Sequence, residues 1–280
     1  MLLLVDLDGV VYRGDEPVPG MAALLTRRVA AGDAVIYVTN NSRWHRSAYL
    51  ERLRGLGAPV SAATIVTAAR ATALALVERL GTGAPSGPTG GPVMVFGGPG
   101  LAQEVRDVDL RTVAPTPFGL AAAPAAVVVG VDFALSYQRL STAAEAVRRG
   151  AWFVATNRDP VFPTADGLAA GAGSVVAALV VAAGREPDLV VGKPEPHLFR
   201  EAAQLAGVPV EQAVVLGDGL GTDILAAHRV GARSVLLLTG VTSRAEAAAA
   251  AGGAHAPTAV VADAGELDAV LQRLADEGRP

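Results

Sequence analysis

Residues 2–10 read LLLVDLDGV, an apolar run that ends in two aspartates separated by one residue. A short run of leucine and valine with polar residues after it is typical of a strand buried on both faces. Alternate side chains of a strand share a face, so we expect Asp6 and Asp8 to lie together at its carboxyl end. Two adjacent carboxylates repel each other, and a hard divalent cation such as Mg²⁺ would relieve that repulsion through oxygen ligands. The simpler alternative is a surface turn with two acidic residues.

The composition of the 280-residue chain predicts a folded protein with a sizeable core, because 51% of its residues are hydrophobic and 18% are charged. The net charge of −4 argues against nucleic acid or an anionic membrane as the main partner. The absence of cysteine excludes disulfides, thiolate catalysis and zinc–sulfur sites. No apolar run approaches the ~20 residues that span a bilayer. No basic leader precedes the first strand, so we expect a cytoplasmic enzyme.

Short apolar runs alternate with segments of helical periodicity along most of the chain. This alternation predicts an α/β fold with a parallel sheet and helices on its faces. The expected strands are 2–8, 34–38, 93–96, 125–131, 152–155, 189–191, 213–216, 234–238 and 260–261. The expected helices are 21–31, 44–56, 67–80, 140–149, 175–183, 195–206, 224–230 and 266–275. Long loops are expected over residues 81–92 and 158–173. The last third resumes the pattern of the first, so we expect a core of residues 1–67 and 186–280 with an α/β domain, residues 68–185, inserted into it.

Polar side chains follow four of the expected strands. They are Asp6 and Asp8, Thr39 and Asn40, Lys193, and Asp218 and Asp223. In open parallel sheets, ligands bind beyond the carboxyl ends of the strands, so these groups are expected to converge. Carboxylates bind a cation, hydroxyl and amide groups donate to phosphate oxygens, and an ammonium pairs with phosphate. Together they indicate a site for phosphoryl transfer.

Lys193 is the only lysine among the 23 basic residues of the chain. In a sequence that otherwise uses arginine, its retention suggests a task that needs a compact ammonium, such as lying between carboxylates and a phosphate. The alternative is a surface lysine without a special role.

Four motifs carry a resemblance to a known family. They are DLDGV at 6–10, TNN at 39–41, GKP at 192–194 and GDGLGTD at 217–223. In order and kind they resemble the four motifs of the haloacid dehalogenase superfamily, and the large insertion resembles the C2-type cap of its phosphatases. That group includes p-nitrophenyl, phosphoglycolate, glycerol-phosphate, pyridoxal and nucleotide phosphatases. Within the insertion, residues 129–132, 156–160, 166–168 and 171–174 also resemble that group. The resemblance implies a Rossmann-like core with an α/β cap.

The resemblance implies a role for each motif residue. Asp6 would attack phosphorus and form an aspartyl-phosphate, while Asp8 would protonate the leaving group and later activate water. Mg²⁺ would be held by the Asp6 carboxylate, the Asp8 carbonyl and Asp218, with Asp223 binding through water or orienting Lys193. The phosphoryl oxygens would be held by Thr39, Asn40, Asn41 and Lys193.

The cap loop over residues 157–173 would set specificity. Asn157, Arg158, Asp159 and Phe162 are the candidates for substrate contact. Alternatively, Asn157 could only cap a turn, and Arg158 and Asp159 could pair with each other on the surface. Few aromatics in this loop favour a small polyol or sugar phosphate, or a related metabolite such as phosphoglycolate. Phe162 stands where pyridoxal phosphatases of this type carry histidine, which argues against a pyridoxal substrate. Relatives often form homodimers through the cap.

The sequence departs from the fourth motif of the family at two positions. Gly219 and Gly221 replace the bulkier and acidic residues usual in the fourth motif, which predicts a looser loop there. Dehalogenases of the superfamily lack the second aspartate, so Asp8 argues against that activity. A non-catalytic phosphate-binding or receiver-like module would be shorter and would have no cap. A nucleotide or pyridoxal phosphatase of the same type is the alternative to a phosphatase acting on a small metabolite.

Overall fold

The computed structural model describes residues 1–81, 91–164 and 167–277. By its internal contacts the chain divides into two compact units. The first comprises Met1–Thr39, Tyr49–Val66 and Lys193–Pro280, and the second comprises Asn40–Ala48 and Thr67–Gly192.

The first unit is built on a six-stranded sheet with the order β15-β14-β13-β1-β4-β5. Its strands are β1 (Leu2–Asp6), β4 (Ala34–Thr39), β5 (Ile65–Thr67), β13 (Ala213–Gly217), β14 (Arg233–Leu237) and β15 (Ala259–Val261). From β15 across to β4, neighbouring strands pair in parallel. All five residues of β1 are buried, which confirms the predicted strand with two covered faces. Because β1 lies between β13 and β4, its carboxyl end is central in the sheet.

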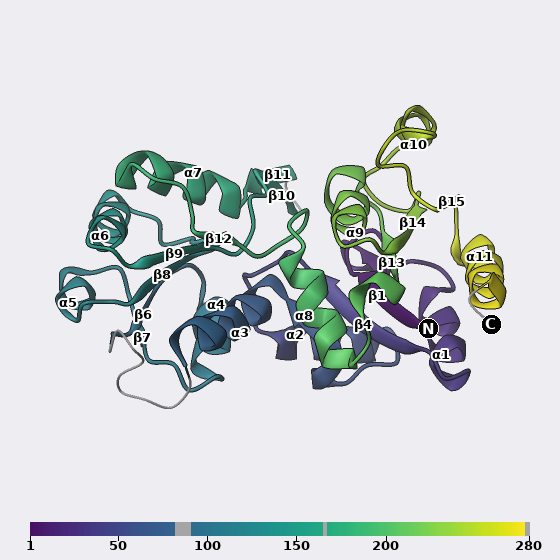
Figure 1. Cartoon of the computed structure of the whole chain (residues 1–280), viewed down its shortest axis with the longest axis horizontal. Coiled ribbons are helices and arrows are strands. Elements are labelled where there is room, and N and C mark those ends of the chain that lie inside the picture. The colour runs from purple at the N-terminus through teal and green to yellow at the C-terminus, as the bar shows by residue number, and fades with distance from the viewer. Residues whose placement is uncertain (82–90, 165–166, 278–280) are drawn as a thin grey trace. The chain divides into compact units, whose positions relative to one another are not determined.

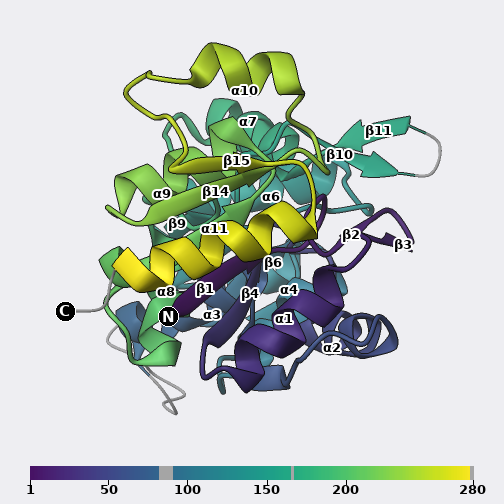
Figure 2. The same ribbon diagram turned by 90° about the vertical axis from the view of Figure 1, so that its right-hand side faces the viewer.

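Helices cover both faces of this sheet (Figures 1 and 2). They are α1 (Met21–Ala30), α2 (Arg46–Gly55), α8 (His197–Ala206), α9 (Leu225–Arg229), α10 (Arg244–Ala250) and α11 (Ala264–Glu277), with short turns of helix at Ala62–Thr64, Val210–Gln212 and Leu220–Ile224. A small hairpin pairs β2 (Tyr12–Arg13) with β3 (Glu16–Pro17). Leu3 of β1, Leu25 of α1 and Leu271 of α11 belong to one buried core, so α1 and α11 close the same face. The apolar stripes of these helices therefore fasten them to the sheet.

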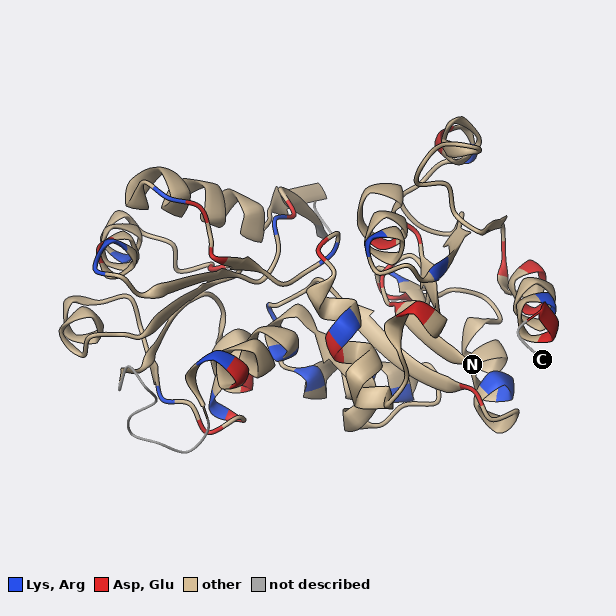
Figure 3. Ribbon diagram, viewed as in Figure 1, with Lys and Arg blue, Asp and Glu red and all other residues tan. Residues whose placement is uncertain are grey.

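The second unit has a five-stranded sheet with the order β12-β9-β8-β6-β7. Its strands are β6 (Val93–Phe96), β7 (Thr112–Val113), β8 (Ala126–Val129), β9 (Trp152–Ala155) and β12 (Leu189–Val190), all paired in parallel. Its helices are α3 (Ala68–Leu80), α4 (Pro99–Arg106), α5 (Pro117–Ala121), α6 (Tyr137–Arg148) and α7 (Ala172–Ala183). Charged residues occupy its helices and loops, whereas β6, β8 and β9 carry none (Figure 3). The predicted parallel α/β class is thus confirmed.

Several segments differ from the sequence prediction, among them the short strands β2, β3, β5 and β7, or fall outside the described residues. Residues 158–173 contain an antiparallel hairpin of β10 (Val161–Thr164) and β11 (Gly167–Ala170), where only a loop is predicted. Pro163 within β10 hides the pattern, because proline inside a run argues against a strand. The short helices α4 and α5 are also not predicted. Most of the loop expected over residues 81–92 lies outside the described residues. No described helix has both the length and the apolar character needed to cross a membrane.

Candidate active site

Lys193 connects two carboxylates at the carboxyl edge of the first sheet. Its Nζ lies 2.6 Å from Oδ1 of Asp6 and 2.6 Å from Oδ1 of Asp223. All three side chains are at least nine-tenths buried. Asp6 is the last residue of β1, and Lys193 is the first residue of the chain after it leaves the second unit. The structure therefore brings together three of the four predicted polar strand ends through buried, charge-assisted contacts.

The loop after β13 holds Asp223 in place. One turn of π-helix, Leu220–Ile224, carries Asp223 back toward the sheet. Its Oδ2 accepts hydrogen bonds from the backbone N–H of Gly219 at 3.2 Å and from Oγ1 of Thr222 at 3.0 Å. A Cβ on Gly217 would overlap the Asp223 side chain, so the glycine permits this close approach. Both oxygens of Asp223 are thus occupied by donors of this chain.

Asp218 follows the same strand and lies beside the first aspartate motif. Val5 of β1 is in register with Leu216 of β13, so Asp218 emerges next to the end of β1. Its Oδ2 accepts from the backbone N–H of Val241 at 2.7 Å. The chain packs closely here, because a Cβ on Gly9 or on Gly240 would overlap the Asp218 carboxylate. Gly9 has a φ of +77°, in the left-handed region that favours glycine.

Asp8 lies in a turn rather than on the strand. The backbone N–H groups of Val10, Val11 and Tyr12 all donate to the carbonyl of Leu7, which turns the chain directly after β1. Asp8 is an exposed residue. Loss of water around its carboxyl group nevertheless raises its pKa, while the charges of Arg52 and Lys193 act in the opposite direction. Because the residue is exposed, we expect that rise to be modest.

The buried carboxylates hold protons more strongly than free aspartates do. Burial raises the pKa of Asp6 well above its usual value, although Lys193 opposes the shift and the charges of Asp223 and Asp218 add to it. Burial and the charge of Asp223 raise the pKa of Asp218 to about 6. Burial alone would lower the pKa of Lys193, but the carboxylates of Asp223 and Asp6 outweigh it and raise that pKa. The site therefore has a stable ammonium and an excess of negative charge.

This donor set fits a hard divalent cation. Asp6, Asp218 and Asp223 each offer a carboxylate oxygen, and these oxygens all lie within 4.8 Å of one another. Burial is the main cause of the raised pKa values of Asp6 and Asp218, and repulsion from the neighbouring carboxylates adds to it. All three side chains offer carboxylate oxygens, which are the ligand atoms that Mg²⁺ prefers.

Thr39 belongs to the first unit and the two asparagines after it belong to the second. Asp6 is in register with Val38, so the buried Thr39 lies at the end of the strand next to Asp6. Asn40 donates through Nδ2 to the carboxylate of Asp159, at 3.0 Å to Oδ2 and 3.3 Å to Oδ1. Asn157 donates through Nδ2 to the carbonyl of Asn40 at 2.7 Å.

The other predicted substrate-binding residues of the second unit differ in burial and in hydrogen-bond partners. Asn157 is buried, and its Oδ1 accepts from the backbone N–H of Asp159 at 3.0 Å, so both ends of its amide are engaged. Arg158 forms an exposed ion pair with Glu186. Oδ1 of Asn41 accepts from the backbone N–H of Arg43 at 2.9 Å. Within this unit Asn40 is thus bound to Asn157 and Asp159, whereas Asn41 accepts from the neighbouring Arg43.

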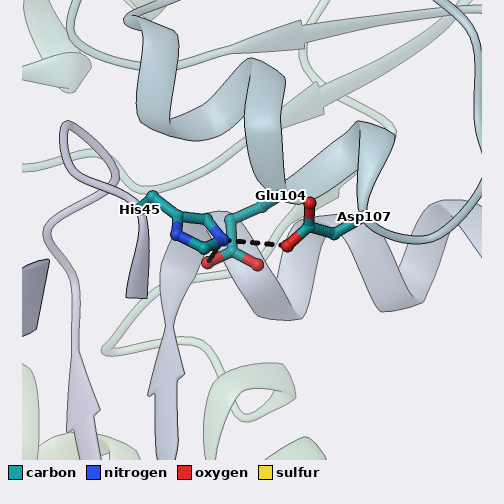
Figure 4. Close-up of side chains that lie close together, drawn as sticks. All are labelled: His45, Glu104 and Asp107. Atoms are coloured by element: carbon teal, nitrogen blue, oxygen red, sulfur yellow. Dashed lines mark hydrogen bonds and ion pairs between the residues drawn. The ribbon is translucent and has the colours of Figure 1, made fainter. Parts of the chain in front are cut away.

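A second group of potential metal ligands lies on the second unit (Figure 4). His45 contacts Asp107 at 2.9 Å and Glu104 at 3.4 Å through Nε2. The guanidinium of Arg46 pairs with both carboxylates. Because Arg46 already neutralises much of their charge, we interpret the group as an ion-pair cluster that fastens residues 45–46 to α4.

Several supporting contacts have no signal in the sequence. Asp159 contacts Asn40 across 119 positions, and Val241 contacts Asp218 across 23. Thr239 donates through Oγ1 to the carbonyl of Gly9 at 2.5 Å. Polar residues at strand ends can be recognised in the sequence, but their partners depend on tertiary packing.

The comparisons with known proteins agree with this fold. Residues 3–111 match the model for haloacid dehalogenase-like hydrolases, and residues 190–267 match the model described as HAD-hydrolase-like. Chronophin from Homo sapiens is 40% identical over 252 residues, covering 88% of this chain and 84% of its own. The chain therefore belongs to the haloacid dehalogenase-like hydrolases.

Solved structures of similar proteins include phosphatases. The p-nitrophenyl phosphatase from Archaeoglobus fulgidus has a TM-score of 0.85 and 31% identity, covering 96% of this chain and 98% of its own. The glycerol phosphate phosphatase from Mycobacterium tuberculosis, in complex with magnesium, has a TM-score of 0.82 and 36% identity, covering 95% of this chain and 75% of its own. Within its family, the chain is thus a phosphatase by similarity.

Proposed function

We propose that this protein is a Mg²⁺-dependent phosphomonoesterase that acts on a small phosphorylated metabolite through an aspartyl-phosphate. The observation that carries the proposal is the buried contact of Lys193 with Asp6 and Asp223, next to Asp218. A carboxylate held by an ammonium, with further carboxylates nearby for a cation, has the groups that phosphoryl transfer requires.

In the first step, a carboxylate oxygen of Asp6 attacks phosphorus. A bond forms between that oxygen and phosphorus, and the bond from phosphorus to the alcohol oxygen breaks. The carboxylic acid of Asp8 gives its proton to the leaving oxygen, which departs as the alcohol. The raised pKa of Asp8 favours the protonated form that this step requires. Lys193 holds Oδ1 of Asp6 and thereby orients the nucleophile.

In the second step, water attacks the phosphorus of the aspartyl-phosphate. Asp8, now ionised, takes the proton from water, and the bond from phosphorus to the Asp6 oxygen breaks. Inorganic phosphate leaves, and both aspartates return to their starting states. One group thus serves as acid and then as base, while Asp223 keeps Lys193 in position through the cycle.

In this proposal Mg²⁺ is held by the carboxylates of Asp6 and Asp218 and by the carbonyl of Asp8. Asp223 contributes through water or by orienting Lys193. When bound, the ion supplies neutralisation of charge on the transferring phosphoryl group. The phosphoryl oxygens are held by Thr39, Asn40, Asn41 and Lys193.

The inserted domain is proposed to act as a cap. Residues 68–185 form it, and residues 1–67 with 186–280 form the catalytic core. Asn157 and Arg158 are proposed to contribute to the substrate side of the cap. Glycerol phosphate, phosphoglycolate and sugar phosphates are the candidate substrates, and glycerol phosphate is the one named for two similar proteins. Homodimerisation through the cap and a cytoplasmic location stay predictions.

Hydrolysis of p-nitrophenyl phosphate tests the proposed function. We expect turnover with Mg²⁺, loss of turnover in EDTA, and recovery when Mg²⁺ is restored. Asp15→Asn is a matched control for Asp6→Asn, because it removes the same charge from an exposed position of the same unit. Activity that persists in EDTA would contradict the metal requirement, and activity that persists in Asp6→Asn would contradict the nucleophile.

A further inference from the structure

Two arginines three positions apart in the second unit have opposite surroundings. The guanidinium of Arg46 pairs with Glu104 and Asp107. The guanidinium of Arg43 pairs with no carboxylate and donates to no carbonyl among the residues that the structure describes. Its recorded partners are the rings of Trp44 and Phe133, each with its centroid 4.4 Å from the guanidinium carbon.

The two rings fix the Arg43 guanidinium without satisfying its donors. Aromatic faces attract a guanidinium through cation–π contact and stacking, but they accept no in-plane hydrogen bond. Among the described residues, no acceptor binds the N–H groups along its edge. Trp44 is 46% exposed and Phe133 is 66% exposed, so small molecules can reach this part of the surface. A planar cation held in place with open donors matches a carboxylate or phosphate in two-point geometry.

The backbone that carries Arg43 packs closely against α4. Its N–H donates to Oδ1 of Asn41, and a Cβ on Gly100 would overlap the backbone of residues 43–45, so α4 packs directly against this segment. The cluster of His45 and Arg46 with Glu104 and Asp107 holds the next two residues to the same helix (Figure 4). Little conformational freedom is then lost when a ligand binds to Arg43.

Arg43 is close in sequence to the proposed phosphate-binding motif. It lies three residues after Asn40, to which the proposed function assigns a phosphoryl oxygen, and both belong to the second unit. Phe133 in turn contacts Phe162 of β10 edge to face, with ring centroids 6.2 Å apart. That strand belongs to the segment 157–173 that we expect to set specificity. Arg43 therefore adjoins both the phosphate-binding motif and the specificity segment.

We infer that Arg43, held between Trp44 and Phe133, is a specificity-determining residue that binds a second anionic group of the substrate. The preferred substrate is then a phosphomonoester that carries a carboxylate or a second phosphate. This inference rests on the proposed function and selects, among its candidate substrates, those of the phosphoglycolate kind over neutral polyol phosphates. The guanidinium forms two hydrogen bonds to the second anion while the phosphomonoester end is hydrolysed.

The ratio of kcat/KM for 2-phosphoglycolate to that for glycerol 3-phosphate tests the inference. We expect the wild type to favour 2-phosphoglycolate and Arg43→Gln to lower the ratio roughly 10- to 100-fold, as the loss of a hydrogen-bonded ion pair implies. The loss should appear mainly in KM for 2-phosphoglycolate. Arg43→Lys should recover part of the ratio, because an ammonium keeps the positive charge but cannot form the two parallel hydrogen bonds of a guanidinium. Arg149→Gln is the control, since it removes the same charge from an exposed position on the same unit.

The outcomes separate this inference from the proposed function. A ratio unchanged in Arg43→Gln, or lowered equally in Arg149→Gln, would overturn the specificity role. A wild type that hydrolyses p-nitrophenyl phosphate with Mg²⁺ but does not favour 2-phosphoglycolate would overturn it as well, while the phosphatase proposal would stand. Absence of p-nitrophenyl phosphate hydrolysis by the wild type would contradict the proposed function itself. Melting curves for each variant show that the ratio is measured on folded protein.

Discussion

The Nζ atom of Lys193 lies 2.6 Å from Oδ1 of Asp6, although the two residues are 187 positions apart in the chain. Lys193 also holds Asp223, so one ammonium contacts two buried carboxylates. Such a group is costly to bury unless every charge is paired. The only lysine of the sequence contacts both carboxylates and compensates one of their two charges, so stability and activity should depend on the same residue.

Lys193→Met should destabilise the protein by about 3–5 kcal/mol, because it leaves Asp6 and Asp223 buried without a counter-charge. Denaturation by urea measures this change. The double variant Lys193→Met with Asp223→Leu should lose less than the two single variants added together, since it removes a charge of each sign. Simple additivity would show that the pair does not interact across its 2.6 Å contact.

Gly9→Ala should be more costly than Gly14→Ala. Both glycines have positive φ values, +77° and +57°, so both substitutions strain the backbone by roughly 1–2 kcal/mol. Only at Gly9 would the new Cβ also overlap the Asp218 carboxylate, whereas nothing lies within 4 Å at Gly14. Gly9→Ala should therefore also raise the Mg²⁺ concentration needed for activity. Equal effects of the two substitutions on stability and on Mg²⁺ dependence would refute the close packing.

The metal-free protein should gain stability from these aspartates as the pH falls from 7.5 toward 5. The pKa of Asp218 is raised to about 6 in the folded state and that of Asp6 is also raised, so the folded state binds protons more tightly than the unfolded state. Their ionisation thus disfavours folding as the pH rises, by up to about 3 kcal/mol for Asp218. Mg²⁺ should remove this penalty at pH 7.5 and stabilise less at pH 5, where Asp218 is protonated.

Asp218→Asn isolates that contribution. Denaturation of wild type and variant is compared at both pH values, with EDTA and with Mg²⁺. The difference in stability between the two proteins in EDTA should shrink as the pH falls. A difference that stays constant with pH would show that Asp218 titrates normally.

The parts of the molecule that could be predicted from sequence are those with local patterns. The apolar run before Asp6 predicts its buried strand, and the polar residues after the strands predict that Lys193 lies near Asp6 and Asp223. The hairpin over 161–170 could not be predicted, because Pro163 and glycine interrupt its alternation. Asp8 is displaced from the strand by the turn at Leu7, a backbone feature without a sequence period.

The sequence also does not indicate which residues far apart in the chain form hydrogen bonds or ion pairs with each other. Nothing local in TNRDP, residues 156–160, indicates that Asp159 accepts hydrogen bonds from Asn40. Similarly, Arg43 and Arg46 have the same side chain in the same segment, yet one is paired with acids and the other lies between rings. Only the packing of α4 and of the segment after β8 distinguishes them.

The covalent role of Asp6 is tested most directly by rapid acid quench of the Asp8→Asn variant with p-nitrophenyl phosphate and Mg²⁺, followed by mass spectrometry of its peptides. Asp8→Asn retains the nucleophile but removes the base that would activate water. The mechanism predicts one phosphate on the peptide that contains Asp6 and none when Asp6→Asn is added. Release of p-nitrophenol by Asp8→Asn, with no phosphate on that peptide at any quench time, would contradict an aspartyl-phosphate at Asp6.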